Sequence, residues 1–233
     1  MRPDRDAPVV SRLVVALDGP AASGKGTLAR KLAEAFNLAH LDTGALYRSV
    51  AVMVLRSGIP ENDEDAVAAT IAQMGAGSIP ERELRSEAAG RIASVVAAMP
   101  KVRAALLAFQ REFAASPPAG KEGAVLDGRD IGTVVCPQAD VKFFVTASVE
   151  ERARRRHAEL QSRGESITYE AVLADLKDRD ARDRSRAEAP LKQAEDAVLL
   201  DTTELDIEAA FRQAVDVIAR RKGMGVSASP ARP

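Results

Sequence analysis

The segment LVVALDGPAASGKGT at residues 13–27 decides the fold. Residues 13–17 are all apolar, which is typical of a strand buried on both faces of a parallel sheet. The spacing GxxxxGK begins two residues after this strand, and apolar residues recur at helical intervals from Lys25 to Phe36. A strand, a glycine-rich turn and a helix in this order predict a phosphate-binding loop.

The backbone of such a loop suits a polyphosphate, because its N–H groups and the N-terminus of the helix point into one concavity. Lys25 adds a positive charge for the outer phosphates. Gly26 stands where Ser or Thr usually follows the lysine, so the following Thr27 is the candidate hydroxyl ligand of Mg²⁺. The alternative is an ordinary turn without a ligand. The residues expected to hold ATP are Gly19, Pro20, Ala21, Ala22, Ser23, Gly24, Lys25, Gly26 and Thr27.

The rest of the chain alternates between strand and helix patterns. Further short strands are expected near residues 38–41, 124–126, 141–145 and 198–200. This order predicts an α/β protein with the three-layer P-loop fold and a central parallel sheet of about five strands. We expect a single domain over residues 13–222, with disordered tails at 1–12 and 223–233.

Two helical segments interrupt the alternation. Residues 60–118 are expected to form a helical insertion, including a helix at 84–96 and another that begins after Pro100. An arginine-rich helix begins after Ser148, which has capping-box spacing to Glu151, and a further helix is expected at 169–186. Gly164 lies between these two helices, which predicts a lid at about 155–170.

Composition excludes several classes of protein. The formal net charge of −1 gives no global field for a nucleic acid polymer or an anionic membrane. A single cysteine, Cys136, rules out an internal disulfide, and no apolar run has the length of a signal peptide or a membrane span. We therefore expect a cytoplasmic protein with no membrane or nucleic acid partner. The sequence indicates no large exposed apolar surface, so we expect a monomer.

Two polar motifs follow the second and third strands. DTGALYR at 42–48 and DGRD at 127–130 both lie at the carboxyl edge of the sheet, where open α/β sheets bind ligands. Arg48 and Arg129 could donate to a second phosphate opposite the loop, and Asp127 is the expected acidic partner of Mg²⁺. For either arginine alone, a surface ion pair is the alternative.

The late helices carry a third cluster of charge. Arg152, Arg155 and Arg156 share one helix face, as do Arg179, Asp183 and Arg186 on the next helix. Arginines brought in by a closing lid would neutralise the transferred phosphate and exclude water. The alternative is a solvated surface on which Glu150, Glu151 and Glu159 supply the partners.

In these motifs the chain resembles the bacterial cytidylate kinases, a branch of the nucleoside monophosphate kinases, from about Leu13 to Arg220. The resemblance implies transfer of the γ-phosphate of ATP, with Mg²⁺, to CMP or dCMP, giving ADP and CDP or dCDP. It also implies a mobile nucleotide-binding insertion and a lid. The segments that carry the resemblance are residues 19–27, 42–48, 127–135 (DGRDIGTVV) and 179–191 (RDARDRSRAEAPL).

The resemblance also implies roles for individual residues. Thr43 and Asp183 are expected near the ribose, Arg48 and Arg129 at the phosphate, and Ser94 and Arg103 at the cytosine and phosphate. Arg179 and Arg186 are expected around the nucleotide, and Asp130 beside it. Many family members have a small antiparallel sheet in the insertion, whereas residues 74–87 here are short and show no alternating pattern.

A phosphate acceptor is already anionic near neutral pH, so catalysis rests on positioning and charge neutralisation rather than on a general base. Lys25, Arg129 and Arg155 are the expected catalytic residues. Two other functions stay open on the residues alone. One is a kinase of another small metabolite, such as a sugar acid or shikimate; the other is a P-loop regulator or ATPase, which would hydrolyse ATP without an acceptor.

Overall fold

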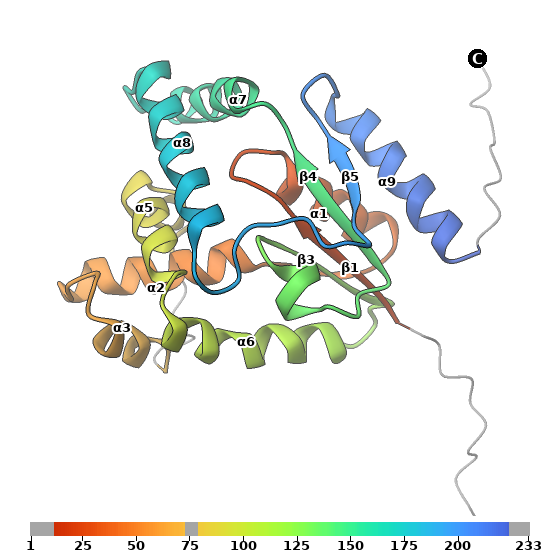
Figure 1. The fold of residues 1–233 in the computed structure, drawn as a ribbon, viewed down its shortest axis with the longest axis horizontal. Helices are drawn as coiled ribbons and strands as arrows, with labels where there is room; N and C mark the ends of the chain where they lie inside the picture. The colour runs from red at the N-terminus through yellow and green to blue at the C-terminus, as the bar shows by residue number, and fades with distance from the viewer. Residues whose placement is uncertain (1–11, 73–78, 224–233) are drawn as a thin grey trace, which may run out of the picture.

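The computed structural model describes residues 12–72 and 79–223. Its centre is one sheet of five parallel strands in the order β2-β3-β1-β4-β5 (Figure 1). The predicted parallel sheet of about five strands is therefore confirmed. The strands are β1 (Leu13–Asp18), β2 (Ala39–Asp42), β3 (Gly123–Gly128), β4 (Val141–Thr146) and β5 (Val198–Asp201).

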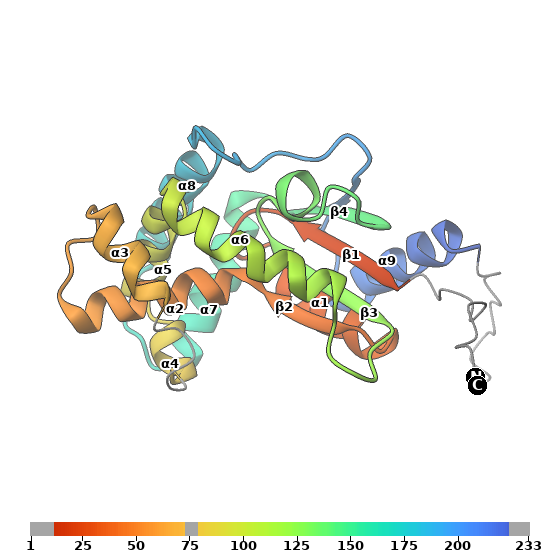
Figure 2. The same cartoon turned by 90° about the horizontal axis from the view of Figure 1, so that it is seen from below.

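Helices cover both faces of the sheet and make three layers. On one face, α1 (Lys25–Ala35) and α9 (Ile207–Arg221) pack on buried residues such as Val15 and Phe143. On the other face, α6 (Pro100–Ala115) and one turn of π-helix, η1 (Ile131–Val135), cover smaller residues; Figure 2 shows α6 running alongside the strands. Both faces of the sheet are buried, as the continuous apolar run of β1 predicts.

A second apolar core lies beyond the edge of the sheet. The expected helical stretch at 60–118 contains, in its described part, α3 (Glu64–Ile71), α4 (Glu81–Leu84), α5 (Glu87–Val96) and α6, and these pack with α2 (Thr43–Ser57). The helix predicted at 84–96 begins instead at Glu87, because the Ser86 hydroxyl accepts the N–H of Ala89 at 3.2 Å and caps it there. Residues 79–87 contain no strand; residues 73–78 lie outside the described part.

Helices α7 (Val149–Ser162) and α8 (Tyr169–Ser185) pack on each other above the phosphate loop (Figure 1). The predicted cap of α7 is confirmed, since Ser148 Oγ accepts the N–H of Glu151 at 3.2 Å. Gly164, just beyond α7, has a φ of +78°, which lets the chain turn toward α8. The side chain of Ala21 packs against the apolar cluster between the two helices.

The predicted tails fall almost wholly on residues 1–11 and 224–233, which lie outside the described part of the chain. Between residues 12 and 223, as far as described, no single helix is long and apolar enough to cross a membrane. Among the described helices, α5 and α6 taken together are the one pair with that length and composition, and they are bent by 98° at their junction.

Asp18 connects the phosphate loop to the segment that carries Arg129. It is the last residue of β1, it is buried, and its two carboxylate oxygens accept the N–H groups of Ile131 and Gly132, each at 2.7 Å. These bonds hold the first residues of η1 against the strand that leads into the loop. Burial raises the pKa of Asp18 to about 6, although the two hydrogen bonds act in the opposite direction.

The raised pKa of Asp18 predicts a pH-dependent stability. A carboxyl group whose pKa is higher in the folded chain stabilises fully below its ordinary value of 3.8, and this contribution is lost as the pH rises to about 6. Relative to Asp18→Asn, the wild-type free energy of unfolding should therefore fall by roughly 2 to 3 kcal/mol between about pH 4 and pH 6. Urea denaturation of both proteins across this range measures the difference. A pH-independent difference would contradict the raised pKa.

Candidate active site

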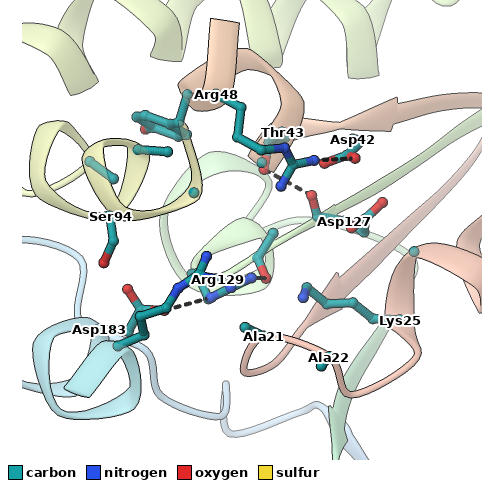
Figure 3. Close-up of a pocket in the computed structure, with 18 of the residues that line it drawn as sticks. Ala21, Ala22, Lys25, Asp42, Thr43, Arg48, Ser94, Asp127, Arg129 and Asp183 are labelled. Atoms are coloured by element: carbon teal, nitrogen blue, oxygen red, sulfur yellow. Dashed lines mark hydrogen bonds and ion pairs between the residues drawn. The ribbon is translucent and has the colours of Figure 1, made fainter. Parts of the chain in front are cut away.

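One cavity of about 500 Å³ opens at the carboxyl edge of the sheet and is bounded by α2, α5, α7 and α8. Figure 3 shows the part of it that Lys25, Arg48, Ser94, Arg129 and Asp183 line. It brings together every residue predicted to bind the acceptor, both predicted metal ligands and all three predicted catalytic residues. The predicted site residues that line it are Ala21, Ala22, Gly24, Lys25, Gly26, Thr27, Thr43, Arg48, Ser94, Arg103, Asp127, Arg129, Asp130, Arg155, Arg179, Asp183 and Arg186. Gly19, Pro20 and Ser23 belong to the same loop but do not line this cavity.

The phosphate loop depends on glycine at two positions. A Cβ on Gly19 would lie 1.9 Å from the carbonyl oxygen of Val145, so no other residue fits there. Gly24 has a φ of +87° and is the N-cap residue of α1. The first residue of that helix is Lys25, whose Nζ donates to the Pro20 carbonyl at 3.1 Å and lies within the curve of the loop.

The charge of Lys25 is unfavourable in this position. Burial, followed by the positive charge of Arg129, lowers its pKa from 10.5 to about 7. Asp127 and Asp42 act in the opposite direction but do not compensate. A polyphosphate beside Lys25 would supply negative charge, which favours the protonated lysine.

The predicted metal ligands suit Mg²⁺ only in the company of a nucleotide. Oδ1 of Asp127 lies 3.8 Å from the place of a Cβ on Gly26, so no side chain separates this carboxylate from the loop. Oδ2 hydrogen-bonds to Nε2 of His40 at 2.7 Å, and Thr27 Oγ1 accepts from Arg30 at 3.2 Å. Within the described residues no three His, Cys, Asp or Glu side chains form a metal cage. Mg²⁺ is commonly held by one carboxylate, waters and substrate phosphates, and the residues present fit that arrangement.

Each predicted phosphate-binding arginine is paired with an aspartate. Arg48 bonds to Asp42 at 2.8 Å, and Arg129 Nε bonds to Asp183 Oδ2 at 2.7 Å (Figure 3). Burial would raise the pKa of Asp183, but the positive charges of Arg129 and Arg186 hold it below its ordinary value. Both arginines thus form ion pairs, which was the alternative to phosphate binding. These pairs nevertheless line the cavity and hold the arginines in it.

Contacts within the protein also orient the side chains of Arg103 and Thr43. Arg103 forms a buried ion pair with Asp130 and also donates to the Ala97 carbonyl at 3.3 Å. The hydroxyl of Thr43 donates to the Asp127 carbonyl at 2.8 Å, so only its oxygen is left to accept from a ligand. Both residues are therefore oriented by the protein itself.

Three buried polar atoms at the cavity have no hydrogen-bond partner among the described residues. They are Nε of Arg48, Oγ of Ser94 and Nη2 of Arg186. Buried polar atoms nearly always have a hydrogen-bond partner, so three such atoms without one around the same cavity indicate a polar ligand, although Nη2 of Arg186 also lies 3.7 Å from Oδ1 of Asp183. Arg179 also faces α5 closely, since a Cβ on Gly90 would lie 3.5 Å from its Nη1.

The arginines of α7 do not act as one group. Arg155 donates to the hydroxyl of Thr202 at 3.0 Å and pairs with Glu151, and Arg156 pairs with Glu159, as the alternative reading expected. Both still line the cavity. Arg152 does not: it is buried between α7 and α8, which corrects its grouping with the other two. Helical periodicity places the three arginines on one face of α7, but α8 covers the part of this face that carries Arg152.

A second cavity of about 370 Å³ lies on the other side of the phosphate loop. Ser23, Gly24 and Arg155 line it together with Thr202, Leu205 and other residues between β5 and α9. This cavity was not predicted from the sequence. The available signal was the position of Thr202, directly after β5 at the carboxyl edge of the sheet.

Comparison with known proteins gives concordant results. A family model described as cytidylate kinase matches residues 15–220. A cytidylate kinase of Rhodopseudomonas palustris is 55% identical over 206 residues, which are 88% of this chain and 96% of the relative. One of Xanthobacter autotrophicus is 56% identical over 212 residues, or 91% of this chain and 100% of the relative.

Among solved structures, an uncharacterized protein from Eubacterium ventriosum has a TM-score of 0.52 at 14% identity, covering 89% of this chain and 98% of its own. This similarity shows the fold alone.

The lowered pKa of Lys25 predicts opposite effects of one substitution on stability and on turnover. Lys25→Met removes a buried charge beside Arg129, so we expect a higher melting temperature. The same change removes the charge opposite the outer phosphates, and turnover of a nucleoside triphosphate should fall at least about 100-fold. Thermal denaturation and initial rates measure the two effects, with Lys31→Met as the control, a partly exposed lysine of the same helix that lines neither cavity. Turnover near that of the wild type would contradict the role of Lys25.

Proposed function

The chain belongs to the cytidylate kinase family, and we propose that its main cavity holds the triphosphate of ATP and a cytidine monophosphate for direct phosphoryl transfer. The protein is an ATP-dependent phosphotransferase that transfers the γ-phosphate of ATP to CMP or dCMP, giving ADP and CDP or dCDP. One observation carries the assignment to this cavity: Lys25 of the phosphate loop, Arg129 and the Asp183 carboxylate that holds Arg129 line the same space.

The donor side is formed by the phosphate loop. Its N–H groups and Lys25 would bind the outer phosphates of ATP, and Arg155, close to Gly24, would approach them from α7. The second cavity, which shares Gly24, Thr27 and Arg155 with the first, is the place for the nucleoside of ATP. This assigns Ser23 and Thr202 to the donor site as well.

The acceptor side is formed by α2, α5, α8 and the segment after β3. Arg48, Arg103 and Arg129 would exchange part of their aspartate contacts for the phosphate of CMP. Oδ2 of Asp183 accepts from Arg129, whereas Oδ1 lies 3.7 Å from Nη2 of Arg186, beyond hydrogen-bond distance, so Oδ1 would accept from the ribose. Ser94, with an unpaired buried hydroxyl on α5, would contact the base.

Catalysis in this arrangement needs no general base, because a phosphate oxygen of CMP is already an anionic nucleophile. This oxygen attacks the γ-phosphorus of ATP, a P–O bond forms as the bond to the β-phosphate oxygen breaks, and ADP leaves. Lys25, Arg129 and Arg155 would stabilise the negative charge on the transferred group, more strongly in a cavity than in water. Asp127, together with Thr27, would hold Mg²⁺, which when bound supplies further charge neutralisation.

Four features stay predictions from the sequence. They are the functional limits of the insertion at about 60–118, the lid at about 155–170, the cytoplasmic location and the monomeric state. Closure of the lid over the cavity would bring Arg155 and Arg156 closer to the phosphates and exclude water.

The direct test is ADP formation from ATP and Mg²⁺ with CMP, dCMP, UMP, AMP or no acceptor, measured side by side. We expect strong stimulation by CMP and dCMP and a much lower rate without acceptor. The same assay also tests the two other functions that the sequence left open. Equal rates with and without acceptor would identify an ATPase, and stimulation by shikimate or a sugar acid instead of CMP would identify a different kinase.

A further inference from the structure

We propose that the buried ion pair between Arg152 and Asp180 is a positioning element, which aligns the phosphate loop with α7 and α8 and thereby sets the affinity for the donor nucleotide and the rate of turnover. The proposal rests on the proposed function for the identity of the donor. Neither residue lines either of the two cavities described above, so the pair acts through the residues that it holds in place.

The guanidinium group of Arg152 binds three separate segments. It donates to both carboxylate oxygens of Asp180 on α8, at 3.1 and 2.6 Å. Its Nε donates to the Ala147 carbonyl at 3.0 Å, just before α7 begins, and its Nη1 donates to the Ala21 carbonyl at 3.2 Å. One side chain thus connects the start of α7, the middle of α8 and the crest of the phosphate loop.

Arg152 contacts the loop next to a residue with a strained backbone conformation. Ala22, the residue after the bonded carbonyl of Ala21, has a φ of +58°, which costs a non-glycine residue free energy. The side chain of Ala21 also packs on the apolar cluster of α7 and α8. A charge-assisted hydrogen bond from Arg152 to the Ala21 carbonyl therefore helps to hold this turn in the phosphate-binding conformation.

The same pair sets the position of substrate-facing side chains on both helices. On α7, Arg155 comes three residues after Arg152 and is directed at Thr202 and Gly24. On α8, Asp183 comes three residues after Asp180 and holds Arg129 at 2.7 Å. A shift of either helix would move a charge on the donor side or on the acceptor side. A displacement of about 1 Å in such a group can reduce turnover about 100-fold.

Stability alone does not account for an ion pair in this position. Arg152 and Asp180 are only 2% and 5% exposed, and the neighbouring cluster of α7 and α8 is apolar. A buried ion pair is often replaced by apolar residues of similar size without loss of stability, whereas removal of one partner leaves a buried charge. An apolar pair would pack in this place but would give no hydrogen bond to the Ala21 carbonyl.

The test compares Arg152→Met, Asp180→Leu and the double variant with the wild type, by melting temperature, by the Kd for ADP and by kcat with CMP. We expect both single variants to melt at lower temperature and the double variant to recover most of the loss. The double variant should nevertheless bind ADP at least about tenfold more weakly and turn over at least about tenfold more slowly. The matched control is Arg56→Met with Glu83→Leu, an exposed ion pair of which neither residue lines either cavity; it should change neither ADP binding nor kcat.

A double variant with wild-type Kd and kcat would overturn the proposal, whatever its melting temperature. If the double variant does not fold, Arg152→Lys decides, since a lysine can pair with Asp180 but has no planar fork to reach Ala21 and Ala147 as well. Arg152→Lys should fold and bind ADP more weakly, and unchanged ADP binding would overturn the proposal. Because ADP binding involves no acceptor, a failure of CMP as substrate would refute the proposed function separately.

Discussion

The structure depends on holding many lysine and arginine side chains close together around the main cavity. Ten positively charged side chains of the described residues line the cavity, and burial together with the positive charge of Arg129 lowers the pKa of Lys25 to about 7. Asp42, Asp130 and Asp183 each bond to one of the arginines, which keeps the cations close together and oriented. Bound phosphates would take over part of this role. The positively charged residues are Lys25, Arg30, Arg48, Arg85, Arg103, Arg129, Arg155, Arg156, Arg179 and Arg186.

The parallel sheet makes this concentration of charge possible. The phosphate loop leaves β1, and Arg129 follows β3, which pairs directly with β1 in the same direction. The two sites are therefore neighbours, although more than a hundred residues separate them in the chain. Asp18 strengthens the link through the N–H groups of Ile131 and Gly132. Donor and acceptor phosphates can consequently approach each other over the edge of a rigid sheet, which is the geometry that phosphoryl transfer requires.

Local features were predictable from the sequence, and long-range ones were not. The strand, loop and helix from residue 13 to Phe36, and the cap at Ser148, follow from backbone preferences within a few residues. The π-helical turn of η1 depends on Asp18, 113 residues away in the chain. Periodicity put Arg152 on the same helix face as Arg155, but it carries no information on what covers that face. The roles of the acceptor residues came from family resemblance, and their common place in one cavity is a result of the fold.

The central claim is that the arginines of the cavity recognise the phosphate of the acceptor. The most direct measurement is the Kd of CMP compared with that of cytidine, by titration calorimetry on the wild-type protein. Two or three charge-assisted contacts to the phosphate should make CMP bind at least about 100-fold more tightly than cytidine. Equal affinities would contradict the claim, because the nucleoside alone would then supply the binding free energy.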